Sequence, residues 1–278
     1  MQVCRLLEIS RSGYYAAKSR LKREKVCATT GQLKAAFAAS GRSYGSRRLV
    51  TALNNRGIKI GRHKVRRIMR EARLKPIWKK TFVNTTHSKH NLPVAENRLN
   101  RQFNPTYPNR AWTSDITFIR TRAGWLYLAV VMDLFSRKII GWAMDSTIPA
   151  ELVCRALTMA IGQRQPTAGV LMHSDRGSQY ASHEYQNLLK QQGMICSMSR
   201  KGNCWDNAVI ERFFLNLKME RVWQRDYANH AEAINDITEY IVGFYNCLRL
   251  HSALGNLPPM IYEKHIAAKK LREVSEIS

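Results

Sequence analysis

An aspartate inside an apolar strand is the first residue that suggests chemistry. Asp115 lies within the strand-like string WTSDITF (residues 112–118), although Asp is depleted from strands. A buried carboxylate is costly unless it is paired or binds a metal ion. Asp115 is therefore a candidate metal ligand. The alternative interpretation is an exposed acid on a solvated face of the strand.

Two further acids stand at positions that favour a site. Asp175 ends a strand-like run in the string HSDRGSQY (residues 173–180), and the carboxyl ends of strands are where α/β sheets place their ligands. A turn or capping aspartate before Gly177 is the alternative. Glu211 flanks the apolar face of a predicted helix over residues 206–222, so it can face the edge of a sheet; an ordinary surface glutamate is the alternative.

Lys218 follows Glu211 by seven residues, which places both side chains in one row two helical turns apart. A carboxylate and an amine in that row could hold a metal ion and a phosphate, or form an ordinary surface pair. A hydrolase triad from the adjacent His173, Ser174 and Asp175 is excluded, because neighbouring strand residues point to opposite faces.

The other acids of this region have simpler interpretations. Asp206 is predicted to be a helix N-cap, and Asp133 and Asp145 are predicted to be strand-end or turn acids. Glu151 begins a predicted helix and is a weak candidate for a fourth ligand. Three acids suffice for phosphodiester chemistry, since hard metal ions such as Mg²⁺ take oxygen ligands and keep several waters.

The elements that would position these acids form an α/β sheet. The segments Ala111–Arg120, Leu126–Phe135 and Lys138–Asp145 are apolar, β-branched or aromatic, and they predict an antiparallel meander. Further segments follow in the order helix, strand, helix, strand, helix: residues 150–163, 169–173, 182–192, 194–198 and 206–222. We predict a mixed five-stranded sheet with helices on its faces. Residues 230–247 predict another helix, and a basic, mobile tail is expected after Pro259.

The segment before this sheet is helical and basic. One helix is predicted from Ser46 to a stop at Gly57. In the next, apolar residues occupy one face and arginines the other; the arginines are Arg62, Arg66, Arg70 and Arg73. Two helices joined by a Gly-containing turn, the second basic, fit a helix-turn-helix that contacts nucleic acid. A solvated charged face is the alternative. Near the N-terminus, apolar residues at 3, 6 and 7 precede Ser10, a further helix cap.

Charge separates the two regions. The chain has 278 residues and a formal net charge of +25. Residues 1–100 carry 24 Lys and Arg against 4 Asp and Glu, and the remainder carries 21 against 16. Such an excess favours a polyanionic partner and argues against a freely diffusing metabolic enzyme.

Membrane and metal-cluster classes are not expected. The sequence contains no apolar run near the ~20 residues that span a bilayer, and its first residues lack the long apolar stretch of a signal peptide. The six cysteines form no CxxC pair, so reduced thiols in the cytosol are expected. A structural zinc site at His87 and His90 is excluded on the same grounds.

Several strings together resemble one known family. Asp115 and Asp175 are separated by 59 residues, and Asp175 and Glu211 by 35. This spacing, with the strings WTSDITFI, DLFSRKIIGW, HSDRGSQY, KGNCWDNAVIERFFLNLK and YNCLRLHSALGNLPP, resembles the second-frame (OrfB) transposase of insertion sequences of the IS-three type. That family is part of the DDE transposase and retroviral-integrase superfamily. The resemblance covers roughly residues 10–265, without departure at the three acids or Lys218.

The resemblance implies a fold and an activity. It implies a ribonuclease-H-like core in which Asp115, Asp175 and Glu211 bind two Mg²⁺ or Mn²⁺ ions. One ion would activate water or a 3′-hydroxyl, and the other would stabilise the leaving oxygen, so that strand cleavage and strand transfer share one step. Lys218 would hold a phosphate at the element's end. Terminal repeats and target DNA, further copies of the chain and a first-frame protein are the implied partners, in the bacterial cytoplasm at the nucleoid.

The expected domain organisation follows. An N-terminal helical segment covers residues 1–30, a helix-turn-helix-like domain 31–74, a linker 75–108, an integrase-like catalytic core 109–265 and a basic tail 266–278. Two other functions stay open: a metal-dependent nuclease on the same ribonuclease-H-like fold, and a non-catalytic DNA-binding regulator derived from a transposase.

Overall fold

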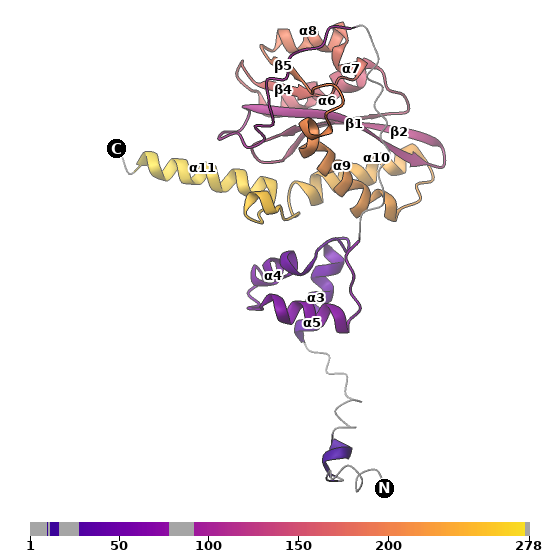
Figure 1. The fold of residues 1–278 in the computed structure, drawn as a ribbon, viewed down its shortest axis with the longest axis vertical. Helices are drawn as coiled ribbons and strands as arrows, with labels where there is room; N and C mark the ends of the chain where they lie inside the picture. Colours follow the sequence, from indigo (N-terminus) through magenta and orange to yellow (C-terminus); the bar gives the residue numbers. More distant parts are fainter. Residues whose placement is uncertain (1–9, 11, 17–27, 78–91, 276–278) are drawn as a thin grey trace. The chain divides into compact units, whose positions relative to one another are not determined.

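The computed structural model describes residues 10, 12–16, 28–77 and 92–275 (Figure 1). The chain divides into two compact units, Met1–Lys75 and Pro76–Ser278. Near the N-terminus, the Gly13 amide donates to Ser10 Oγ at 3.1 Å, so Ser10 caps a short helix as predicted. The apolar residues at 3, 6 and 7, and His87 with His90, lie outside the described residues.

Over residues 28–75 the smaller unit consists of three short helices: α3 (Ala28–Ala39), α4 (Ser46–Asn54) and α5 (Arg62–Glu71). Their apolar faces bury Leu33, Leu49 and Val65 completely. The predicted stop at Gly57 is confirmed, since this glycine has a φ of 79° and the next amide, of Ile58, returns to the Leu53 carbonyl at 3.0 Å. A left-handed glycine closes helices in this way because it has no Cβ.

Helix α5 is shorter than the predicted arginine stripe. It ends at Glu71, and Arg73 has a left-handed backbone with a φ of 50°. The Leu74 amide donates to the Met69 carbonyl at 2.8 Å, which closes the helix end. Arg62, Arg66 and Arg70 therefore lie on the helix, whereas Arg73 lies beyond it, contrary to the prediction of one continuous row.

The larger unit contains the predicted mixed five-stranded sheet, with strand order β3-β2-β1-β4-β5. Its strands are β1 (Ala111–Thr121), β2 (Gly124–Asp133), β3 (Ile139–Asp145), β4 (Leu171–Ser174) and β5 (Ile195–Met198). The first three form an antiparallel meander. Strands β4 and β5 are parallel to β1. The fold class predicted from the sequence is confirmed.

Helices cover both faces of the sheet (Figure 1). On one face lie α6 (Ala150–Arg164), α7 (Ser178–Ala181) and α8 (His183–Gln191), and on the other α9 (Ala208–Glu220) and α10 (His230–Glu239). The middle of strand β2 is apolar on both sides because it contributes to two cores. Ala129 and Val131 pack toward α6, whereas Leu128 and Val130 pack toward α9.

Gly141 sets the closest approach of a helix to the sheet. A Cβ added at this position of β3 would collide with the Ala156 carbonyl oxygen and lie 2.8 Å from the Ala160 nitrogen in α6. Only glycine fits that contact, so α6 lies directly against the backbone of β3.

The segment predicted as a linker is irregular where it is described, but its second half is fixed on the larger unit. Backbone amides of Arg98 and Leu99 donate to Ser197 Oγ in β5, at 2.9 and 3.1 Å. Residues 92–108 therefore pack as part of the larger unit, which the lack of a periodic apolar pattern did not reveal.

The expected mobile tail after Pro259 is instead a helix, α11 (Pro259–Ser275). Proline favours the first turn of a helix. Glu263 anchors this helix to the core through ion pairs with Arg164 and with Lys138, the latter at 3.6 Å. Before α11, the predicted helix over 230–247 is divided into α10 and the π-helical segment η3 (Tyr240–Tyr245).

Cys154, Cys196 and Cys247 are free thiols within the described part of the chain. In the same part, no helix combines the length and apolar composition needed to cross a bilayer.

Candidate active site

Asp115 and Asp175 occupy matching positions on neighbouring strands. Strands β1 and β4 are parallel and pair Trp112 with Met172 and Thr113 with His173. Continuing this register for two residues places Asp115 opposite Asp175, just beyond the last residue of β4. Both side chains then point to the same face, since the side-chain period along a strand is two.

Helix α9 brings Glu211 to that face. Ile210, Phe213 and Leu217 are buried against the sheet, which leaves Glu211 partly exposed in the first turn of the helix. The 3₁₀ turn η1 (Cys204–Asn207) before α9 is tied to β1, because Thr113 Oγ1 donates to Asn207 Oδ1 at 3.1 Å. Glu211 is therefore held beside the strand that carries Asp115.

Like charges perturb one another in this site. Burial raises the pKa of Asp115 well above its ordinary value, and the charges of Asp175 and Glu211 raise it further, against a hydrogen bond from the Ile116 amide at 2.7 Å. Burial and the charge of Asp175 also raise the pKa of Glu211. The structure thus brings the three sequence-predicted acids into mutual electrostatic range.

The sequence did not single out two hydroxyl groups beneath these acids. Ser114 Oγ and the Tyr180 hydroxyl are 3.0 Å apart and buried. Burial and the charges of Asp115 and Asp175 raise the pKa of Tyr180 well above its usual value, so its hydroxyl stays protonated. The bond ties β1 to α7 next to Asp115. Tyr180 falls within the string HSDRGSQY, and its position after Asp175 was the available signal.

Lys218 lies on α9 with its ammonium 4.6 Å from the centre of the Phe118 ring. Burial lowers the pKa of Lys218, and the charge of Asp115 opposes this shift. In return, Lys218 lowers the pKa of Asp115. The lysine is therefore coupled electrostatically to the acidic site, as expected for a group that faces it.

A divalent cation fits the chemistry of these donors. All three are carboxylates, which hard cations prefer. Besides burial, the charge of Asp175 raises the pKa of both Asp115 and Glu211, and a bound cation would relieve this repulsion. As they stand, the described residues include no group of three His, Cys, Asp or Glu side chains arranged closely enough to hold a metal ion. The donor set fits the ion, whereas the coordination geometry is not formed.

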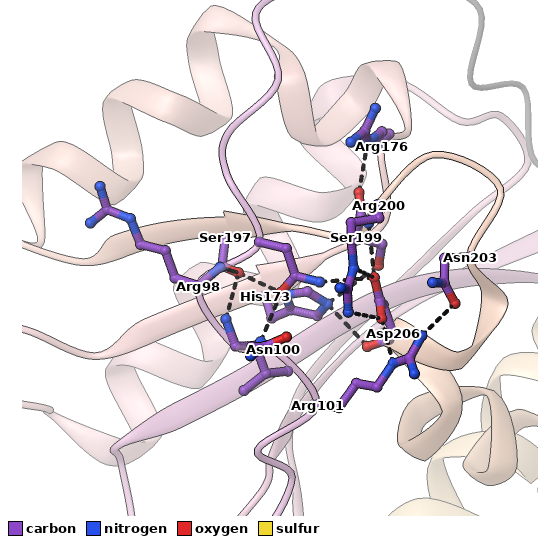
Figure 2. A network of polar contacts seen from close by, with 12 residues as sticks. Arg98, Asn100, Arg101, His173, Arg176, Ser197, Ser199, Arg200, Asn203 and Asp206 are labelled. Atoms are coloured by element: carbon purple, nitrogen blue, oxygen red, sulfur yellow. Dashed lines mark hydrogen bonds and ion pairs between the residues drawn. The ribbon is translucent and has the colours of Figure 1, made fainter.

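Asp206 is not the helix N-cap predicted from the sequence. Its side chain is fully buried and accepts hydrogen bonds from the side chains of Asn97 at 2.8 Å, Arg101 at 2.8 Å and Arg200 at 2.9 Å (Figure 2). These bonds strongly lower its pKa. Local sequence suggested a cap because two of these partners lie about a hundred residues away.

His173 completes the support of the turn η1. Ser197 Oγ accepts amides of Arg98 and Leu99, so its hydroxyl donates to His173 Nδ1, 2.9 Å away. The proton of the ring is therefore on Nε2, which donates to the Asp206 carbonyl at 3.1 Å. Burial lowers the pKa of His173 to about 4. His173 thus has a positioning role, consistent with the exclusion of a hydrolase triad.

A buried ion pair holds the other end of α9. Glu220, its last residue, accepts from Arg249 Nε at 2.8 Å and from the Tyr240 hydroxyl at 2.6 Å. Arg249 is 1% exposed. The string YNCLRLHSALGNLPP, to which Arg249 belongs, therefore positions the helix that carries Glu211 and Lys218.

The remaining acids have structural roles. Asp133 ends β2 and accepts two backbone amides at 3.0 Å. Asp145 ends β3 and pairs with Arg155 at 2.6 Å. Both are strand-end acids, as predicted. Glu151 is exposed in the first turn of α6. In the smaller unit, the side chains of Arg62, Arg66, Arg70 and Arg73 are all exposed.

Family models and solved structures of known proteins are similar to this chain. Residues 105–204 and 192–259 match two family models that are both described as an integrase core domain, and residues 28–82 match an HTH-like domain. Among solved structures, the chain matches the HTLV-2 integrase catalytic core domain in complex with magnesium, with 18% identity, 56% of this chain and 96% of that chain covered, and a TM-score of 0.43. It also matches a simian T-cell lymphotropic virus intasome chain, with 18% identity, coverage of 72% and 66%, and a TM-score of 0.46.

Curated relatives are much closer in sequence. A 31 kDa protein of the insertion element IS600 from Shigella sonnei is 42% identical over 273 residues, covering 94% of this chain and 97% of the relative. Transposase InsF for insertion sequence IS3A from Escherichia coli K12 is 38% identical over 269 residues, covering 94% and 92%.

An integrase core that follows an HTH-like domain defines a polynucleotidyl transferase that acts on DNA. The 38% sequence identity to InsF, which covers 94% of this chain, identifies the particular family. The chain belongs to the transposases of IS3-type insertion sequences, as the sequence strings implied. It is a DNA transposase, and DNA is its partner.

Proposed function

We propose that Asp115, Asp175 and Glu211 form a DDE triad that catalyses DNA strand cleavage and strand transfer with two Mg²⁺ or Mn²⁺ ions. The observation that carries this proposal is the register of β1 and β4, which aligns two carboxylates beside the helix that presents the third. Burial and neighbouring negative charge raise the pKa of Asp115 and of Glu211, as expected for acids of a functional site that binds a cation.

Each residue has a defined task in this scheme. When bound, the metal ions supply nucleophile activation and stabilisation of the leaving oxygen. Asp115, within the central strand β1, and Asp175, directly after β4, would hold the ions, and Glu211 would close the site from α9. Lys218 neutralises a phosphate oxygen of the bound strand, since it shares α9 with Glu211 and is within electrostatic range of Asp115.

The smaller unit binds the DNA backbone. Its exposed arginines Arg62, Arg66, Arg70 and Arg73 supply positive charge along and just beyond α5, and phosphate contacts of this kind position a protein on a duplex. We assign residues 31–74 to binding of the element's terminal repeats and residues 109–265 to catalysis.

Further partners follow from transposition itself. Two element ends must be held together for insertion at one target, which requires more than one copy of a chain with a single active site. We propose that the chain acts as a homo-oligomer with a first-frame protein of the same element, at the nucleoid of the bacterial cytoplasm.

The test uses duplexes that copy the DNA flanking the gene, incubated with full-length protein and Mg²⁺. Asp115→Asn and Glu211→Gln are each expected to reduce cleavage by about 10³-fold or more, since the groups of such a site act as one unit. Glu239→Gln is the matched control, because this glutamate is 72% exposed at the end of α10. Undiminished cleavage by either acid variant would refute the triad.

A second measurement separates the activities. A transposase joins the released 3′-hydroxyl ends to a target plasmid, whereas a nuclease only releases them. A regulator does neither while still binding the flanking DNA. Joined products that disappear in Asp115→Asn are the expected result, and release without joining would identify the nuclease.

A further inference from the structure

The most exposed large apolar side chain among the described residues stands next to the proposed active site. Trp205 is 68% exposed and lies in the turn η1, which leads directly into α9. Single exposed apolar residues are common on protein surfaces. Trp205 differs from them in the rigidity of its support and in the charge around it.

The turn that carries Trp205 is held by its neighbours in the chain. Asp206 is fully buried by the side chains of Arg101, Arg200 and Asn97 (Figure 2). On the far side of Asp206, Asn207 is bonded to β1 through Thr113. The indole is therefore presented to solvent by a fixed backbone, which lowers the entropy cost of binding a flat ligand.

Cations surround this turn. Arg98 and Lys201 are exposed, and the side chains of Arg101 and Arg200 are 43% and 47% exposed although both bond Asp206. Four positive groups against one buried carboxylate leave the surface net positive. A basic surface with an exposed aromatic ring is the arrangement with which proteins bind single-stranded nucleic acid, where bases stack on the ring.

Distance along the chain limits what Trp205 can reach. It precedes Glu211 by six residues, which at about 1.5–2.0 Å per helical residue is roughly 10 Å. Bases along one strand are about 3.4 Å apart. A base on the indole therefore lies within about three nucleotides of a phosphate at the acids.

We propose that Trp205 is a stacking platform for an unpaired base of the DNA strand engaged at Asp115, Asp175 and Glu211. The proposal rests on the proposed active site and adds to it that the DNA end is opened locally. Stacking on Trp205 stabilises the opened strand, and the cations of the turn hold its backbone.

The first experiment compares variants on two substrates. Trp205→Ala is expected to reduce cleavage of a fully paired end by about 10-fold, within the range reported for loss of one base–aromatic stack. The defect should shrink on a duplex whose last three nucleotides before the reacting phosphate are mismatched. Trp205→Phe should retain most activity. Trp223→Ala is the matched control, since Trp223 is 37% exposed just past the other end of α9.

The second experiment needs no catalysis. 5-Iodouracil is placed at each of the four positions next to the reacting phosphate, and photocrosslinking is done in EDTA. A crosslink at one or two positions that is lost in Trp205→Ala and retained in Asp115→Asn is expected. The crosslink does not depend on catalysis by Asp115, Asp175 and Glu211. A failure of the stacking proposal can therefore be distinguished from a failure of the proposed catalytic triad.

Three results would overturn the proposal. One is wild-type cleavage and crosslinking by Trp205→Ala. Another is an equal defect on paired and mismatched ends. The third is a change confined to the oligomeric state in sedimentation, which would make Trp205 a protein–protein contact.

Discussion

The register of the parallel strands β1 and β4, continued two residues past its last pair, places Asp115 opposite Asp175, and burial together with the charge of Asp175 raises the pKa of Asp115. The repulsion between them therefore opposes folding at neutral pH, and it also creates affinity for a cation. The two negative charges thus lower the stability of the metal-free protein but favour binding of the metal ion that catalysis needs.

Asp115→Asn is expected to stabilise the metal-free protein while abolishing cleavage. Removing the repelled charge should raise Tm by roughly 2–4 °C, which corresponds to about 1 kcal/mol in a protein of this size. Because the folded pKa is raised, wild type loses stability as pH rises from about 4 through that pKa. The gain from the variant should therefore be largest at neutral pH and vanish near pH 4. Thermal melts in EDTA across this range measure it.

Thermal melts of the same proteins with added Mg²⁺ test whether these acids bind the metal ion. The wild-type Tm should rise with Mg²⁺ concentration, as binding to the folded state requires, and Asp115→Asn should respond less. Glu239→Gln, at an acid that is 72% exposed, should behave as wild type. Equal Mg²⁺ responses in all three proteins would mean that these acids do not hold the ion.

Asp206→Asn is expected to destabilise the larger unit by about 2–3 kcal/mol, less than a fully buried pair, because water reaches Arg101 and Arg200. The folded pKa of Asp206 lies below its ordinary value. Its contribution is therefore complete above about pH 4 and is lost as pH falls through the folded pKa. Urea unfolding at pH 7 and pH 3 measures this. The difference in unfolding free energy between variant and wild type should be smaller at pH 3 than at pH 7. An equal difference at both pH values would mean that the negative charge of Asp206 does not stabilise the fold.

The contrast between Asp115 and Asp206 shows how far sequence patterns reach. Asp115 was predictable because an acid inside an apolar strand conflicts with its own surroundings in the chain. The stop at Gly57 was equally local. The residues next to Asp206 in the sequence do not indicate that its side chain is buried. Its partners Asn97 and Arg101 come from a segment that shows no periodic apolar pattern. Helix α11 was not predicted because it is also stabilised by a contact between residues far apart in the sequence, the ion pair of Glu263 with Arg164.

Glu220→Gln is expected to cost about 3–5 kcal/mol of stability, because it leaves the buried guanidinium of Arg249 without its charge partner. The double variant Glu220→Gln, Arg249→Met should be less destabilised than the sum of the single variants. Urea titration of the four proteins gives the coupling energy. Strict additivity would mean that the two residues act independently in holding the end of α9.

Arg66→Ala combined with Arg70→Ala is expected to weaken DNA binding and to reduce the salt dependence. Losing two phosphate contacts should lower the slope of log K against log salt by about 2 for duplex DNA. Arg67→Ala is the control on the same helix, since Arg67 pairs with Glu71 at 3.7 Å. Fluorescence anisotropy at several salt concentrations measures the slope. An unchanged slope would move the DNA-binding surface away from α5.

Lys218→Ala is expected to reduce binding and cleavage of the element's ends while the Mg²⁺-induced rise in Tm survives. The ammonium lies over Phe118 and is coupled to Asp115, so its loss removes a phosphate contact and leaves the three carboxylates. Lys218→Arg should restore part of the binding because it keeps the charge, although the guanidinium has a different shape. The rise in Tm should be at least as large in Lys218→Ala, since removing the positive charge of the lysine reduces its repulsion of a cation near Asp115. Normal cleavage by Lys218→Ala would mean that Lys218 is an ordinary residue of α9 without a role in binding the DNA.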